Sequence, residues 1–89
     1  MTNHLHQSLY LEAGDVVEVM SDTHANVQLM DDSAYSSYRS GRSFDYYGGF
    51  FRYFPARLRA PSSGYWNVVL DLGGGTGTVR HSIRVLSSV

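Results

Sequence analysis

The sequence has no cysteine, no lysine and no long apolar run. Without cysteine, disulfide bonds and thiolate metal sites are excluded, and a reducing compartment is compatible with the chain. No apolar stretch approaches the ~20 residues that a membrane-spanning helix needs. The opening residues Met1–His6 do not place an apolar region after a basic one, as a secretion signal would. We therefore expect a cytoplasmic protein with no membrane partner.

The absence of lysine makes arginine the only fully charged base. Residues 1–38 hold six acids and no base, whereas residues 39–89 hold all seven arginines and two acids. The planar guanidinium suits carboxylates, phosphates and aromatic faces. Because the net charge is only −1, the simplest interpretation is that the two halves pair with each other inside one fold. A chain of 89 residues with 43% hydrophobic residues is expected to form one domain over residues 1–89.

The clearest structural signal lies at residues 65–72. Trp66, Val68, Leu70 and Leu72 alternate with Tyr65, Asn67, Val69 and Asp71, which predicts a half-buried strand. The sole tryptophan offers a large apolar area, so the other strands are expected to cover its face. Similar patterns predict further strands at residues 4–11, 16–20, 25–30, 56–60 and 78–85, and aromatic-rich segments predict two more at residues 43–47 and 50–54.

Turn residues predict how these strands connect. Residues 21–24 predict a hairpin between the second and third strands, and Gly48-Gly49 a hairpin turn or bulge between the aromatic segments 43–47 and 50–54. Pro55 indicates an edge or a corner. The glycine run 73–77 fits a hairpin turn better than a phosphate-binding loop, because no lysine follows it and the next segment alternates like a strand.

Residues 31–41 depart from the strand pattern. Asp31, Asp32 and Ser33 are residue types that cap helices, and Gly41 can end one. Tyr35 and Tyr38 would share a face of this short helix and lie over the end of the core. About eight short strands with one helical crossing at residues 31–41 predict an all-β fold, an antiparallel β-sandwich or a jelly-roll-like variant of it.

An arginine and aromatic cluster over residues 39–59 is the main candidate for a binding surface. Aromatic faces can stack on bases or sugars, while guanidinium groups bind phosphates or carboxylates. The candidate ligand-binding residues are Arg42, Tyr46, Tyr47, Arg52, Tyr53, Arg57 and Arg59, among Arg39, Phe44, Phe50, Phe51 and Phe54.

This surface favours a non-catalytic recognition module that binds a small anionic ligand, a glycan or a protein partner. Single-stranded nucleic acid or a nucleotide is the alternative, against which the near-neutral charge counts. A purely structural interpretation also stands, with rings buried on one face and arginines exposed on the other. Adjacent rings such as Phe50 and Phe51 point to opposite faces of a strand, so they cannot both face the same core. The ring on the outer face would then form a contact patch or a homodimer interface.

Other reactive residues form weaker patterns, and neither a cofactor nor a metal is expected. His4 and His6 share a strand face and would need His24, His81 or a carboxylate to hold a metal. Asp22, Asp31 and Asp32 lack the spacing of a calcium loop, and helix capping explains the last two. No nucleophile motif is present, so catalysis is not expected; a small hydrolase using His81 or His24 is the least favoured alternative.

Several ordered segments resemble a known family. Residues 14–19, 26–31, 46–49, 61–66, 71–74 and 82–85 resemble, in that order, the small bacterial family DUF1883, a domain of unknown function. The resemblance covers essentially the whole chain. It implies a β-sandwich module that occurs alone or N-terminal to a TIR-type signalling domain, and it supplies no catalytic residues.

Overall fold

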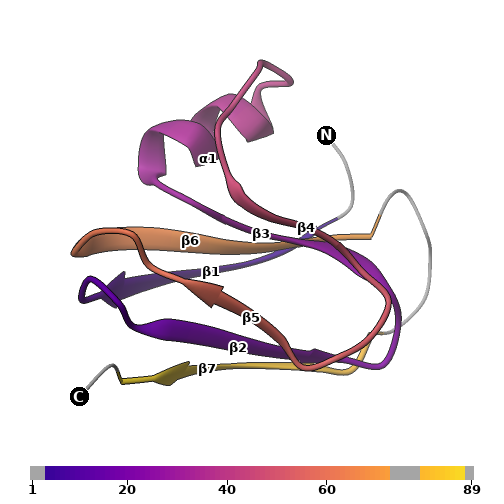
Figure 1. Cartoon of the computed structure of the whole chain (residues 1–89). Coiled ribbons are helices and arrows are strands. Elements are labelled where there is room, and N and C mark those ends of the chain that lie inside the picture. Colours follow the sequence, from indigo (N-terminus) through magenta and orange to yellow (C-terminus); the bar gives the residue numbers. More distant parts are fainter. Residues whose placement is uncertain (1–3, 73–78, 88–89) are drawn as a thin grey trace.

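The computed structural model describes residues 4–72 and 79–87, which form a two-layered antiparallel β-sandwich with one helix (Figure 1). Sheet A has the strand order β1-β6-β3-β4, and sheet B has the order β5-β2-β7. The strands are β1 (His4–Leu11), β2 (Val16–Ser21), β3 (Ala25–Met30), β4 (Tyr47–Phe51), β5 (Ala56–Arg59), β6 (Gly64–Asp71) and β7 (His81–Leu86). The predicted all-β sandwich is confirmed, with seven strands in the described residues where about eight were expected.

The chain changes sheet at every strand connection except the one between β3 and β4. The predicted hairpin of β2 and β3 is therefore wrong, because β2 pairs with β5 and β7, whereas β3 pairs with β4 and β6. Val17 and Val19 on β2 belong to the same buried cluster as Val27 and Leu29 on β3. Placing the two strands in opposite layers buries these faces against each other, which a side-by-side hairpin would not do.

The core lies between the two sheets. Trp66, Val68 and Leu70 of β6 lie in it, as the alternation predicted. The indole is almost fully buried, and its Nε1 donates a hydrogen bond of 3.0 Å to the carbonyl of Ser62. The rest of the buried cluster is Leu11, Val17, Val19, Val27, Leu29, Ala56, Leu58 and Ala60.

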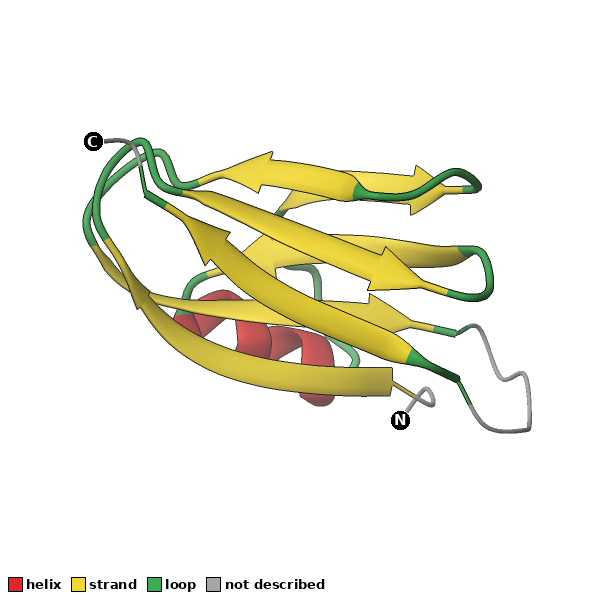
Figure 2. Ribbon diagram, turned by 90° about the horizontal axis from the view of Figure 1, so that it is seen from below, coloured by secondary structure: helices red, strands yellow, loops and turns green. Residues whose placement is uncertain are grey.

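Helix α1 (Asp32–Arg39) covers the outer face of sheet A. Figure 1 shows it above β6 and β3, and Figure 2, seen from below, shows it behind the strands. Under this cover Val69 is fully buried and Asn67 is 2% exposed, so the prediction that β6 is a half-buried strand is wrong. Alternation identifies the face toward the core, but it does not reveal that a helix packs on the other face.

The helix itself is confirmed, with Asp31 as its N-cap. The Asp31 carboxylate accepts a hydrogen bond of 2.7 Å from the backbone N–H of Ala34. Tyr35 and Tyr38 do not lie over the end of the core; they pack on the outer face of sheet A against His4. No helix in the described part of the chain is long and apolar enough to cross a membrane.

Strand β4 corrects the predicted second hairpin. Gly48 and Gly49 lie inside one continuous strand, Tyr47–Phe51, which pairs with β3. Gly48 has a φ of 122°, and a Cβ there would overlap the carbonyl oxygen of Val27. The glycine pair thus serves close backbone packing instead of a turn. Pro55 does mark a corner, where the chain passes from β4 in sheet A to β5 in sheet B. The predicted glycine turn at 73–77 lies outside the described residues.

Candidate functional site

The residues predicted to form one binding surface lie in separate places. Arg42 lies in the segment that follows α1, on the outer side of sheet A, where it lines a cavity with Gln28. Tyr46 follows in the same segment and contacts Phe44, with ring centroids 5.4 Å apart. Tyr47 begins β4 and meets Trp66 edge-to-face at 6.1 Å.

The remaining predicted residues lie farther along the chain. Arg52 and Tyr53 are exposed between β4 and β5, and the Arg52 guanidinium lies 5.7 Å from the Phe50 ring centroid. Arg57 and Arg59 are exposed on β5 of sheet B. Only Arg42, among the residues predicted to bind ligand, lines the cavity beside α1.

A network of rings and hydrogen bonds holds α1 on sheet A. The His6 ring stacks on Tyr35, with centroids 3.9 Å apart and planes 14° apart. The His6 Nε2 and the Asn67 Oδ1 are hydrogen bonded at 2.7 Å, and the Asn67 amide nitrogen donates to Asp32 at 2.8 Å. His4 Nε2 lies 3.1 Å from the Tyr35 hydroxyl. The two histidines on β1 thus pack against the helix, and His6 is hydrogen bonded to Asn67.

A cavity of about 460 Å³ lies between the C-terminal end of α1, the segment after it and the outer face of sheet A. Its principal lining residues come from four elements of the fold: Gln28, Tyr38, Arg39, Arg42, Phe44 and Asp71. Phe44 supplies an apolar side, with its ring edge-to-face with Tyr38 at 5.2 Å. The cavity therefore combines aromatic surface with groups of both charges.

The polar floor of the cavity contains an unsatisfied group. Gln28 on β3 is 7% exposed, and its Oε1 is buried with no hydrogen-bond partner among the described residues. A buried amide oxygen without a partner costs about 1–3 kcal/mol, and such groups in native proteins call for an explanation. Beside it the Tyr38 hydroxyl donates a hydrogen bond of 2.7 Å to the Asp71 carboxylate. The floor thus offers the Asp71 carboxylate, while the Gln28 Oε1 is buried and exposes almost no surface of its own.

The rim of the cavity is basic. Arg39 and Arg42 are exposed, and the Arg39 guanidinium lies 5.7 Å from the Tyr35 ring centroid. The sequence singled out Arg42 but not Gln28 or Asp71. Gln28 carries one signal that could have identified it: it is a polar residue within the otherwise apolar run of Val27, Leu29 and Met30. That signal becomes informative only once α1 is known to cover the face of the sheet on which Gln28 lies.

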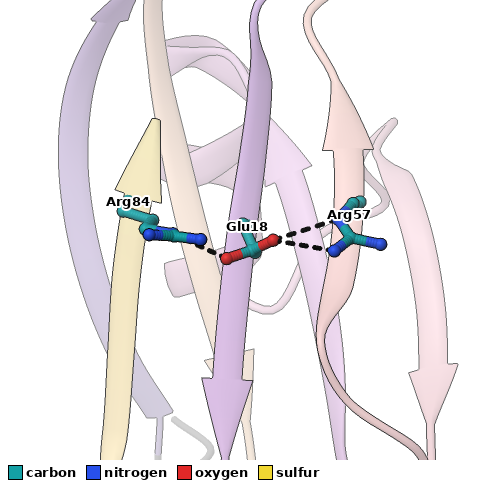
Figure 3. Close-up of polar contacts among 3 residues, drawn as sticks. All are labelled: Glu18, Arg57 and Arg84. Carbon is teal, nitrogen blue, oxygen red and sulfur yellow. Dashed lines mark hydrogen bonds and ion pairs between the residues drawn. The ribbon is translucent and has the colours of Figure 1, made fainter. Parts of the chain in front are cut away.

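On the opposite side of the molecule, Glu18 lies between two arginines (Figure 3). Its Oε2 accepts from Arg57 at 3.0 Å, and its Oε1 accepts from Arg84 at 2.6 Å. The hydrogen bond from Arg84 is the main cause that lowers the pKa of Glu18; desolvation opposes it, and Arg57 adds to the lowering. Here the acidic first half of the chain does pair with the basic second half, as the sequence predicted.

The other two histidines lie apart from these sites. His24 contacts the Phe50 ring at 5.4 Å. His81 and Asp22 line a shallow hollow of about 320 Å³ at one end of sheet B, where an Asp22 oxygen accepts a hydrogen bond from the backbone N–H of Arg80. Within residues 4–72 and 79–87, no group of three or more histidines, aspartates and glutamates is placed to hold a metal ion.

Comparison with known proteins gives one result. A family model described as "Domain of unknown function (DUF1883)" matches residues 2–89. Searches of the curated proteins and of the solved structures returned no significant match.

Proposed function

Since the chain belongs to the DUF1883 family, which has no assigned function, we propose a function from the geometry of the structure. The protein is a non-catalytic recognition module that binds a small anionic ligand in the cavity beside α1. The observation that carries this proposal is the unpartnered Oε1 of Gln28, in a residue that lines the cavity. Because this oxygen is buried, the Gln28 side chain must turn toward the cavity for a ligand to reach it. A hydrogen bond donated by the ligand would then remove the desolvation penalty of the oxygen.

The charges around the cavity support an anionic ligand. Arg39 and Arg42 lie at the rim, and the guanidinium group binds carboxylates and phosphates through paired hydrogen bonds. Asp71 and Gln28 lie at the floor and would accept hydrogen bonds from amino or ring N–H groups of the same molecule. The ligand that fits is therefore small, carries an anionic group at one end and bears hydrogen-bond donors at the other.

The aromatic side supports a ligand with a flat or apolar portion. Phe44 lines the cavity next to Tyr38, and aromatic faces stack on planar rings. Nucleoside monophosphates, acidic amino acids and sugar acids meet some or all of these requirements. Recognition needs only this complementarity, so the proposal assigns no bond-making step.

A thermal-shift experiment tests the proposal. The protein is heated with inorganic phosphate, adenosine monophosphate, glutamate or glucuronate in turn. A ligand at about a hundred times its Kd adds about 2.7 kcal/mol to the free energy of unfolding. For a domain of this size, each kcal/mol raises the Tm by about 4–8 °C.

The matched variants are Arg42→Gln and Arg52→Gln, which remove the same charge at the cavity rim and at a distant exposed position. We expect the ligand-induced shift to fall in Arg42→Gln and to persist in Arg52→Gln. Equal shifts in both variants, or no shift with any of the probes, would contradict the proposed site.

A second candidate function is binding of single-stranded nucleic acid along β4. It is favoured by the exposed Phe50 and Tyr53 rings and by the Arg52 guanidinium over Phe50. Fluorescence anisotropy with a labelled oligonucleotide at about 50 and 200 mM salt tests it, because phosphate contacts make the affinity fall steeply with salt. Under this alternative Phe50→Ala weakens binding while Arg42→Gln has the smaller effect.

A further inference from the structure

The outer face of sheet B is open, unlike that of sheet A. Helix α1 lies on the sheet A side, and Figures 1 and 2 show no described element on the other side of β5, β2 and β7. The strand register defines which side chains occupy this face. The outward positions are Val16, Glu18, Met20, Arg57, Arg59, Ser82, Arg84 and Leu86.

This face carries three arginines against one carboxylate. Glu18 is the only acid at its outward positions, and both of its oxygens are already engaged by Arg57 and Arg84. The side chains of those arginines are 59% and 69% exposed, while that of Glu18 is 7% exposed. Glu18 therefore acts as a buried anchor that holds two guanidinium groups in place, and their outward edges remain open to solvent.

Arg59 extends the basic surface along β5. It is exposed and lies two positions from Arg57 on the same face of the strand. Residues i and i+2 of an extended chain are about 6.6–6.8 Å apart, so carboxylates at alternate positions of an extended partner would match the spacing of these arginines. Pre-oriented guanidinium groups lose less side-chain entropy when such carboxylates bind.

We propose that the outer face of sheet B binds an extended acidic segment of a partner protein, with Arg57, Arg59 and Arg84 as its contacts. This site is independent of the cavity beside α1. Apolar side chains share the face with the arginines: Met20 is 43% exposed, and Val16 and Leu86 are half-buried. That mixture favours an acidic peptide that also carries apolar side chains over the sugar-phosphate backbone of a nucleic acid, as does the net charge of −1.

The test uses the full chain and a short fluorescent peptide of alternating glutamate and valine, with its glutamine counterpart as the uncharged control. Binding is followed by anisotropy, and contacts are mapped from backbone amide shifts in NMR spectra, which also show whether each variant is folded. Arg59→Glu is compared with Arg52→Glu, which makes the same charge change at an exposed position outside sheet B. Among the described residues, Arg59 forms no hydrogen bond or ion pair with Glu18, so its replacement leaves the ion pairs of Glu18 with Arg57 and Arg84 intact.

The proposal predicts that the acidic peptide shifts amides of β2, β5 and β7, and that the glutamine peptide does not. Arg59→Glu should weaken binding about tenfold or more, which corresponds to about 1.4 kcal/mol, and Arg52→Glu should leave it nearly unchanged. Equal binding of both peptides, equal losses in both variants, or amide shifts confined to sheet A would overturn it. Tighter binding of a single-stranded oligonucleotide at the same face would also overturn it, in favour of nucleic acid.

Discussion

Gly48 is the residue whose backbone conformation lets β4 lie close to β3. Its φ of 122° is one that L side chains rarely adopt, and a Cβ would overlap the carbonyl oxygen of Val27. We expect Gly48→Ala to lower the free energy of unfolding by about 1–3 kcal/mol from backbone strain alone. Gly49→Ala is the control, since a Cβ at Gly49 meets nothing within 4 Å. Urea denaturation measures both; equal losses in the two variants would contradict this role of Gly48.

The second prediction at the scale of single residues concerns Glu18 and the pH dependence of stability. Its folded-state pKa is lowered below the ordinary value of 4.5, chiefly by the hydrogen bond from Arg84. The stabilisation from its charged form is therefore complete above the unfolded-state pKa and is lost as the pH falls through the folded-state pKa.

The measurement for Glu18 is the unfolding free energy of the wild type and of Glu18→Gln over a pH series. The advantage of the wild type should be greatest above about pH 5 and should shrink steadily at lower pH, because glutamine has no charge to lose. A constant difference between the two proteins down to acid pH would show that the Glu18 charge contributes nothing to stability.

Individual residues were predictable from sequence where one interaction decides their environment. Trp66 is in the core and Asp31 caps a helix, as expected, because burial and capping depend on local pattern. Gln28 and Asp71 were missed because their environment is created by a helix and a loop that fold over them. Arg57 was predicted to bind a ligand; that its guanidinium is also held by Glu18, far away in sequence, could not be read from local pattern.

At the scale of elements, α1 is short and depends on its cap and on its contacts with sheet A. Asp31 accepts the hydrogen bond of the Ala34 N–H, and Asp32 accepts from the buried Asn67. We expect Asp31→Ala to cost about 0.5–2 kcal/mol, the usual effect of losing an N-cap. Ser33→Ala, at an exposed neighbouring position, should cost much less. Denaturation followed by circular dichroism distinguishes them, and an equal effect of the two substitutions would mean that the cap is unimportant.

Most strands could be located from alternation, but their pairing could not. Residues 16–20 and 25–30 alternate as strands do, yet the choice between a hairpin and two opposed layers depends on what covers each face. Two adjacent glycines likewise permit either a turn or a close strand contact, and only the partner strand decides between them. The helix at residues 32–39 was recognisable because caps and turn residues are local signals.

At the scale of the whole molecule, the two outer faces of the sandwich are different. Sheet A is covered by α1 and carries a cavity with groups of both charges. Sheet B is open and basic, with Glu18 anchoring Arg57 and Arg84. Glu18 from the acidic first half of the chain and two arginines from the basic second half thus form an ion-paired cluster on sheet B. Two further arginines of the second half form the basic rim of the cavity. This division of surfaces is the basis for the two separate binding sites that we propose.

The most direct test of the central claim, that the cavity beside α1 is a ligand site, is to measure stability and binding in the variant Gln28→Met. Methionine is similar in size and removes the buried oxygen that lacks a partner. We predict that the ligand-free variant is as stable as the wild type or more so, by up to about 1–3 kcal/mol. We also predict that it loses the thermal shift given by the strongest binder among the probes. A shift that survives the substitution, or a clear loss of stability without ligand, would contradict the claim, because Gln28 would then serve the fold and not the ligand.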